Sequence, residues 1–355
     1  MSIQSITHVE FHCADADLTA AGLGADHGFT VEPGVPQPDG LRTVRLRQGS
    51  IRLHFHSAAD PAHPVARYAA RHGDGVAVIA LGCTDPRASL ERAERHGAVV
   101  LDRAGGLVAG FGDLALRFVS QPERAAAGAG ARAGAAAAPG STAGKAAGRA
   151  TAPQPAGALL EALDHAAICV PAGELAPAVR FCEAALGLHR IFGEYIEVGE
   201  QAMDSSVVQS ASGEVTFTLI EPDTTRRPGQ IDTFLADHDG AGVQHLAFRT
   251  ADIAAAVRAG RARGVEFLTT PGAYYDALAE RLGGTAIPVG TLRELDVLVD
   301  QDHGGQLFQI FARSTHPRRT FFLELIERQG AGTFGTANIK ALYEAVERQR
   351  AAASV

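Results

Sequence analysis

The sequence predicts an α+β protein in which one module occurs twice. Two stretches of the first half return in the second half: Ile6–Cys13 is similar to Leu163–Val170, and Gly73–Leu81 is similar to Gly240–Phe248. A segment rich in Ala and Gly separates the two halves. Matched stretches on both sides of such a segment indicate an internal duplication.

The later stretch of each half is followed by the same order of elements. A polar turn leads into a helix, which we expect over Pro86–Arg95 in the first half and over Ile253–Arg263 in the second. Each helix ends beside a glycine, Gly97 or Gly264, and a new strand begins there. Apolar runs such as Val215–Ile220 are typical of strands. The pattern predicts strand–helix–strand modules with additional antiparallel strands.

The separating segment, residues 122–158, is predicted to be a flexible linker. It has many glycines among its alanines and is interrupted by prolines. Each Gly in a helix costs about 1 kcal/mol relative to Ala, and the segment has almost no large apolar side chain to pack. A short helix over residues 131–138 is the alternative. The linker divides the chain into an N-terminal domain, residues 1–121, and a C-terminal domain, residues 159–355.

The composition excludes several classes of protein. The chain has 355 residues and a net charge of −8, so it lacks the basic surplus that nucleic-acid binding requires. Its four cysteines form no Cys-x-x-Cys pair, which argues against a disulfide framework and a structural zinc site. Nothing in the sequence suggests export, so we expect no export signal, and no apolar run reaches the roughly 18 residues that a membrane span needs. We therefore expect a cytoplasmic protein, and the sequence leaves open whether it forms a homo-oligomer.

Three polar residues in the second half interrupt apolar strands and are candidate metal ligands. They are His165, His245 and Glu324. An unpaired ionisable group is costly on a buried strand. Two imidazoles and one carboxylate form the facial triad of non-haem Fe(II) oxygenases, which leaves three coordination positions open. Glu327, which we expect on the same face as Glu324, is the alternative carboxylate.

The first half retains the scaffold without these ligands. The positions that match the triad are His8, Val78 and approximately Arg117, and neither valine nor arginine binds a metal ion. The pair His54-Phe-His56 places two imidazoles on one strand face, but no third ligand is evident from the sequence. We therefore predict a metal centre in the second half alone. Ordinary packing of each strand histidine is the alternative.

The second half resembles the 4-hydroxyphenylpyruvate dioxygenase family of the vicinal oxygen chelate superfamily. The segments that carry this resemblance include Gly240-Ala-Gly-Val-Gln-His245, Gln306-Leu-Phe-Gln-Ile-Phe311 and Phe322-Leu-Glu-Leu-Ile-Glu-Arg-Gln-Gly330. The resemblance covers most of residues 160–350, and the first half resembles a vicinal-oxygen-chelate domain without metal. It implies two domains of paired βαβββ modules that form open barrels, a C-terminal helix, and Fe(II) bound by the triad.

The resemblance also implies a substrate pocket beside the metal. Two positions differ from the dioxygenase pattern: Ile339 stands where a Phe is usual, and Ile220 stands where an Asn is usual. Both differences favour the branch of the family that hydroxylates the benzylic carbon. The positions that match the pocket's remaining lining are Ser205, Gln230, Gln309, Phe311, Phe334 and Asn338.

The implied reaction is oxidative decarboxylation of 4-hydroxyphenylpyruvate with O2. The expected products are 4-hydroxymandelate and CO2. The first alternative is the dioxygenase reaction, which gives homogentisate at the same metal site. A second alternative is a non-catalytic protein that binds a small ligand on this scaffold, and the intact triad argues against it.

Overall fold

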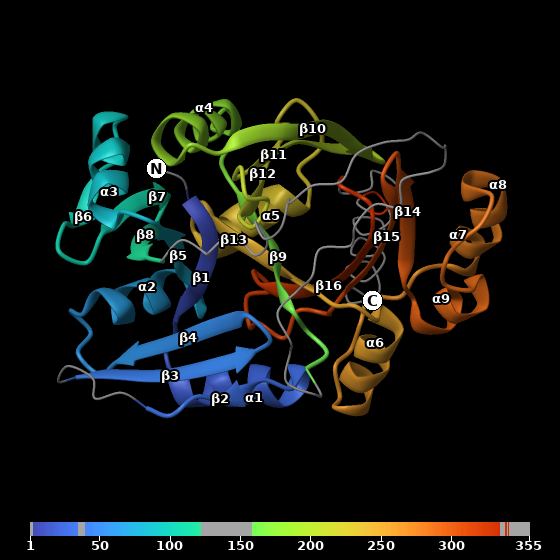
Figure 1. The fold of residues 1–355 in the computed structure, drawn as a ribbon, viewed down its shortest axis with the longest axis horizontal. Helices are drawn as coiled ribbons and strands as arrows, with labels where there is room; N and C mark the ends of the chain where they lie inside the picture. Colours follow the sequence, from blue (N-terminus) through green and yellow to red (C-terminus); the bar gives the residue numbers. More distant parts are fainter. Residues whose placement is uncertain (1–2, 35–39, 122–157, 334–337, 339, 341–355) are drawn as a thin grey trace, which may run out of the picture.

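Two eight-stranded mixed sheets form the framework of the molecule (Figure 1). The computed structural model describes residues 3–34, 40–121, 158–333, 338 and 340. The first sheet and its helices consist of β1 Ile3–His12, α1 Ala16–His27, β2 Thr30–Val31, β3 Leu41–Gln48, β4 Ile51–Ala58, α2 Pro64–His72, β5 Gly75–Cys83, α3 Pro86–Arg95, β6 Val100–Asp102, β7 Leu107–Phe111 and β8 Leu114–Ser120.

The second sheet begins after the linker region and carries more helices. Its elements are β9 Ala162–Cys169, α4 Leu175–Phe181, the π-helix Cys182–Leu186, β10 His189–Val198, β11 Gln201–Gln209, β12 Thr216–Pro222, α5 Gln230–His238, β13 Gly242–Arg249, α6 Ile253–Ala262, α7 Gly272–Asp276, α8 Leu278–Leu282, α9 Val289–Leu295, β14 Leu298–Asp302, β15 Gly305–Phe311 and β16 Phe322–Gln329.

The two sheets have the same topology. The strand order is β2-β3-β4-β1-β5-β8-β7-β6 in the first and β10-β11-β12-β9-β13-β16-β15-β14 in the second. In each, two βαβββ modules meet where their first strands pair antiparallel, β1 with β5 and β9 with β13. Each first strand also pairs in parallel with the last strand of its own module. The predicted α+β class and the paired modules are confirmed.

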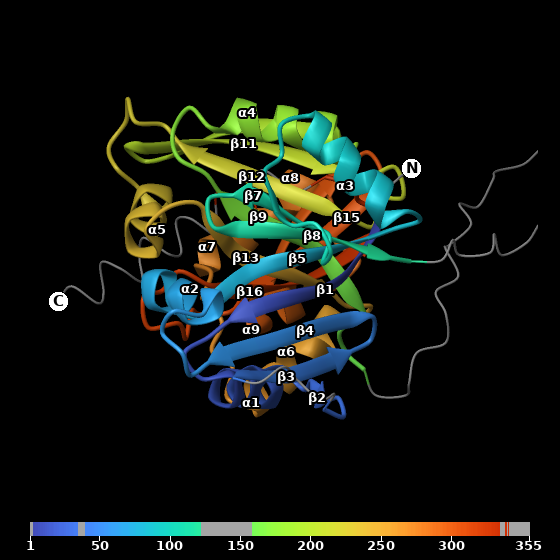
Figure 2. The ribbon, with the colours of Figure 1, turned by 90° about the vertical axis from the view of Figure 1, so that its left-hand side faces the viewer.

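The two halves share one hydrophobic core. Aromatic side chains meet across the boundary: the Phe29 and Phe248 ring centroids lie 5.7 Å apart, and those of Phe111 and Phe181 lie 5.8 Å apart. Strand β5 of the first half lies against β13 of the second (Figure 2). Burial of apolar surface, at about 25 cal/mol per Å², therefore stabilises both halves together.

Most predicted elements lie where the sequence placed them. Helix α3 spans Pro86–Arg95 as predicted, and α6 ends at Ala262, one residue early. The predicted strand Val215–Ile220 corresponds to β12, Thr216–Pro222. The expected linker and its alternative helix lie outside the described residues. The expected last helix also does, apart from Asn338 and Lys340, which are both helical.

Among the residues that the structure describes, no helix is long and apolar enough to cross a bilayer.

Candidate metal centre

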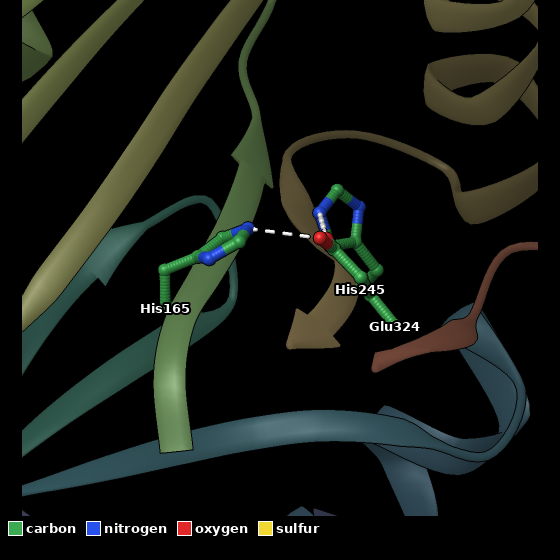
Figure 3. Close-up of side chains that lie close together, drawn as sticks. All are labelled: His165, His245 and Glu324. Carbon is green, nitrogen blue, oxygen red and sulfur yellow. Dashed lines mark ion pairs between the residues drawn. The ribbon is translucent and has the colours of Figure 1, made fainter. Parts of the chain in front are cut away.

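Three adjacent strands bring the predicted triad together. His165 lies on β9, His245 on β13 and Glu324 on β16 (Figure 3). Ala247 of β13 is paired with His165 on one side and with Glu324 on the other. His245 stands two residues before Ala247, so it projects from the same face of the sheet. All three side chains therefore project from one face of the sheet toward the same point.

The geometry of the triad is compact and enclosed. Nε2 of His165 and Nε2 of His245 each lie 3.4 Å from Oε2 of Glu324. The three ligand atoms lie within 4.8 Å of one another, and all three residues are buried. Donor atoms bound to one first-row metal ion at about 2.1 Å stand roughly 3 Å apart in adjacent positions. The arrangement therefore fits a metal ion with little adjustment.

The charges of the triad are strongly coupled. Burial disfavours a charged imidazole at both histidines. The Glu324 carboxylate, together with Asp164, outweighs burial at His165 and raises the pKa of His165 to about 9. Burial and the positive charge of His165 lower the pKa of His245 well below its usual range. A divalent cation would take the place of that proton, because metal ions bind neutral imidazole.

An ion pair behind His165 orients its ring. Nδ1 of His165 lies 3.0 Å from Oδ1 of Asp164, which directs Nε2 toward Glu324. Arg328 donates to both oxygens of Asp164, at 2.8 and 2.9 Å. Burial works against the Asp164 anion, but Arg328 holds its pKa well below the usual range. A carboxylate behind a histidine is a regular companion of metal-binding imidazoles. This pair was not predicted from the sequence, although Asp164 precedes His165 directly.

The alternative carboxylate faces away from the triad. We expected Glu327 on the same face as Glu324, and this was wrong. The two residues are three apart, and an odd spacing on a strand turns side chains to opposite faces. Glu327 instead accepts the backbone N–H of Ile253 at 2.8 Å and the amide of Gln329 at 2.7 Å. Glu327 therefore caps the start of α6.

Four of the expected pocket residues are buried in the second half, and one of them lies near a triad histidine. Phe311 and Ile220 are buried in one apolar cluster on the metal-facing side of the sheet. The Phe311 ring centroid lies 6.5 Å from that of His245. Gln230, at the start of α5, is buried, and the hydroxyl of Ser205 on β11 donates to the backbone of Glu194 at 3.2 Å. Phe334 and Ile339 lie outside the described residues.

One expected pocket residue, Gln309, donates a hydrogen bond to the triad, and a second, Asn338, donates to Gln309. The Gln309 amide donates to Oε1 of Glu324 at 2.7 Å, and the Asn338 amide donates to Oε1 of Gln309 at 2.9 Å. Phe322, which the sequence analysis did not single out, stacks on His245 with ring centroids 4.8 Å apart. Its position two residues before Glu324 on β16, and so on the same face of the strand, was the available signal.

The first half has an internal ion pair at the matching place. The register His8–Ala80–Arg117 repeats the register His165–Ala247–Glu324. Arg117 donates to Oε1 of Glu10 at 2.8 Å, and Nε2 of His8 lies 3.2 Å from the same oxygen. A fixed guanidinium therefore lies beside the carboxylate in this half.

The His54–His56 pair has a carboxylate nearby that the sequence did not reveal. Oε2 of Glu10 lies 3.7 Å from Nε2 of His56. Arg117 already engages that carboxylate. Within the described ranges, the triad is the one group of three or more ligands that meets metal-site geometry.

The chain is similar in sequence to known proteins of one enzyme family. The family model for the glyoxalase/bleomycin resistance protein/dioxygenase superfamily matches residues 164–280. The 4-hydroxyphenylpyruvate dioxygenase of Danio rerio is 30% identical over 97% of this chain and 90% of its own length. The chain belongs to the 4-hydroxyphenylpyruvate dioxygenase family. It is therefore an enzyme.

Two further proteins are similar to this chain. The Caenorhabditis briggsae 4-hydroxyphenylpyruvate dioxygenase is 38% identical over about half of each chain, 54% of this one and 51% of its own. A triple mutant of 4-hydroxymandelate synthase from Streptomyces coelicolor has a solved structure that is 43% identical. It covers 98% of this chain and 99% of its own, with a TM-score of 0.81.

Proposed function

We propose that this enzyme converts 4-hydroxyphenylpyruvate and O2 into 4-hydroxymandelate and CO2. One oxygen atom of O2 enters the new carboxylate and the other becomes the benzylic hydroxyl. The observation that carries the proposal is the 43% identity to a 4-hydroxymandelate synthase along almost the whole of both chains. Ile220, in place of the amide that we associate with dioxygenases, supports the same branch.

The residues of the triad fit Fe(II). Two neutral imidazoles and one carboxylate are its usual protein ligands in non-haem oxygenases. Iron(II) held by His165, His245 and Glu324 would supply open coordination positions and activate O2, while the electrons for O2 reduction come from the substrate. With one carboxylate the loaded site keeps a net charge of about +1, which attracts the carboxylate of a 2-oxo acid.

The protein's own residues orient the substrate and exclude water. Ile220 and Phe311 are both at most 5% exposed and form apolar walls beside the triad. An apolar wall holds an aromatic ring by contact and strengthens nearby electrostatic interactions. Gln309 holds one oxygen of Glu324, and Asp164 holds the ring of His165, so the two ligands keep fixed directions.

Homogentisate formation is the second candidate, because the curated relatives above are named 4-hydroxyphenylpyruvate dioxygenase. The test is product identification after anaerobic loading with Fe(II) and addition of substrate and O2. The two products are isomers of equal mass, so they must be separated by chromatography or NMR. We expect 4-hydroxymandelate, and no product from His245→Ala. Homogentisate as the main product would refute the proposal.

A further inference from the structure

A chain of hydrogen bonds leads from the metal-facing carboxylate toward the surface. The Gln309 amide donates to Oε1 of Glu324 at 2.7 Å, and the Asn338 amide donates to Oε1 of Gln309 at 2.9 Å. The hydroxyl of Tyr274 on α7 lies 3.0 Å from Oδ1 of Asn338. Gln309 and Asn338 are at most 2% exposed, whereas Tyr274 is half-buried. The chain therefore joins a short outer helix to the triad.

The direction of this chain is set at Tyr274. Its oxygen accepts the backbone N–H of Val299 at 2.9 Å and a guanidinium N–H of Arg281 at 3.1 Å. Its single proton has two acceptors within reach, the carbonyl of Val299 and Oδ1 of Asn338. Arg281 already donates to the Val299 carbonyl, so the proton is needed at Asn338. Burial raises the pKa of Tyr274, so the hydroxyl keeps that proton at neutral pH.

The donor at Tyr274 then fixes which atoms of the two following amides donate and which accept. An Asn338 oxygen that accepts from Tyr274 leaves the Asn338 NH2 group to donate to Gln309. A Gln309 oxygen that accepts from Asn338 leaves its NH2 group to donate to Glu324. A flipped amide at either position would place two acceptors against each other, which is costly in a buried site.

We propose that Tyr274 is a positioning residue for the metal centre. Its hydroxyl fixes the Asn338 amide, and through Gln309 this holds Oε1 of Glu324, so that Oε2 alone faces the two imidazoles. Glu324 is thereby kept a one-oxygen ligand, and coordination positions stay open for substrate and O2. This inference rests on the metal centre of the proposed function, but it does not depend on which product forms.

The test is a titration of the metal-free protein with Co²⁺, whose visible absorption reports the coordination number. We compare wild type with Tyr274→Phe and use Tyr275→Phe as the matched control, because the Tyr275 hydroxyl forms none of the bonds described. Partners of metal ligands typically contribute 10- to 100-fold to metal affinity. We expect about tenfold weaker Co²⁺ binding and an altered spectrum in Tyr274→Phe, and no change in the control.

A double-mutant cycle separates an effect through this hydrogen-bond chain from a general destabilisation of the fold. Asn338→Ala breaks the middle of the chain and leaves Tyr274 with its other partners. If the hydroxyl acts through Asn338, adding Tyr274→Phe to Asn338→Ala should weaken Co²⁺ binding less than twofold further. Wild-type Co²⁺ affinity and spectrum in either single variant would overturn the positioning role of Tyr274 and leave the metal centre in place. Additive losses of Co²⁺ affinity in the double variant would do the same. Failure of the wild type to bind Co²⁺ would overturn the metal centre, and the positioning role with it.

Discussion

Arg117 donates to the Glu10 carboxylate at 2.8 Å, at the position in the first sheet that corresponds to Glu324 in the second. The two copies of the duplicated scaffold therefore neutralise a buried carboxylate in different ways. In the second half a carboxylate and two imidazoles face one another, in an arrangement that could hold a cation from solution. In the first half the cation is part of the chain, and the site is neutralised internally.

The ion pair in the first half should be needed for stability. Arg117→Met leaves the Glu10 anion, whose side chain is 9% exposed, without its main partner. Burial alone raises the pKa of Glu10, but hydrogen bonds from His8 and Arg117 outweigh it and hold that pKa well below its usual range. We expect the free energy of unfolding to fall by about 2 kcal/mol, measured by urea denaturation.

Two variants check this assignment. The double variant Glu10→Gln/Arg117→Met removes both charges and should be less destabilised than Arg117→Met. Arg87→Met disrupts an exposed pair with Glu91 and should cost less than about 0.5 kcal/mol. Equal losses in Arg87→Met and Arg117→Met would show that the Glu10 pair is not special.

The choice of carboxylate ligand can be tested directly. Glu324→Gln replaces an anionic oxygen ligand with a neutral amide, so we expect no stoichiometric iron and no turnover. Glu327→Gln is the matched control, because Glu327 faces α6 rather than the triad. Metal analysis of both purified variants decides the point. Iron loss from Glu327→Gln but not from Glu324→Gln would mean that the assignment is reversed.

Stability should fall at mildly acidic pH because the first half buries neutral histidines. Burial lowers the pKa of His12 to about 4. Below pH 6.5 the unfolded chain protonates His12 while the folded chain does not, so the unfolded state binds more protons and gains relative stability. We expect the free energy of unfolding to decrease from pH 6.5 to about 4, and His12→Phe to flatten this decrease. An unchanged pH dependence in His12→Phe would rule out His12 as a contributor.

The product should depend on the apolar side chains that hold the substrate ring. Ile339→Phe, or Ile220→Asn, should lower the yield of 4-hydroxymandelate and produce some ring-oxidised product, with iron content unchanged. A misplacement of about 1 Å can alter a rate roughly a hundredfold, so a small change of ring orientation redirects the reaction. Chromatography of the products checks this. Exclusive 4-hydroxymandelate at the parent rate in both variants would show that neither side chain governs the outcome.

The sequence predicted the site because its ligands lie on regular strands of a repeated scaffold. The match of Gly73–Leu81 with Gly240–Phe248 correctly made Val78 the counterpart of His245, since β5 and β13 have the same register to their neighbours. The prediction that Glu327 shares a face with Glu324 was wrong because the two residues are three apart. An odd spacing on a strand places side chains on opposite faces.

Other parts of the site depend on contacts that local patterns do not encode. Asp164 and Arg328 meet across 164 positions of sequence, and Tyr274 reaches Asn338 across 64. Gln309 was predicted only as a residue of the substrate pocket, and the sequence did not reveal that its amide also bonds to Glu324 and Asn338. Such partners become visible only when the strands and helices are assembled.

Anaerobic titration of the metal-free protein with Fe(II) tests the central claim that one half of the duplicated fold carries a single metal centre. We expect one tightly bound iron per chain in the wild type and in Arg117→Met, and none in His245→Ala. Two irons per chain in the wild type, or one in His245→Ala, would contradict this account.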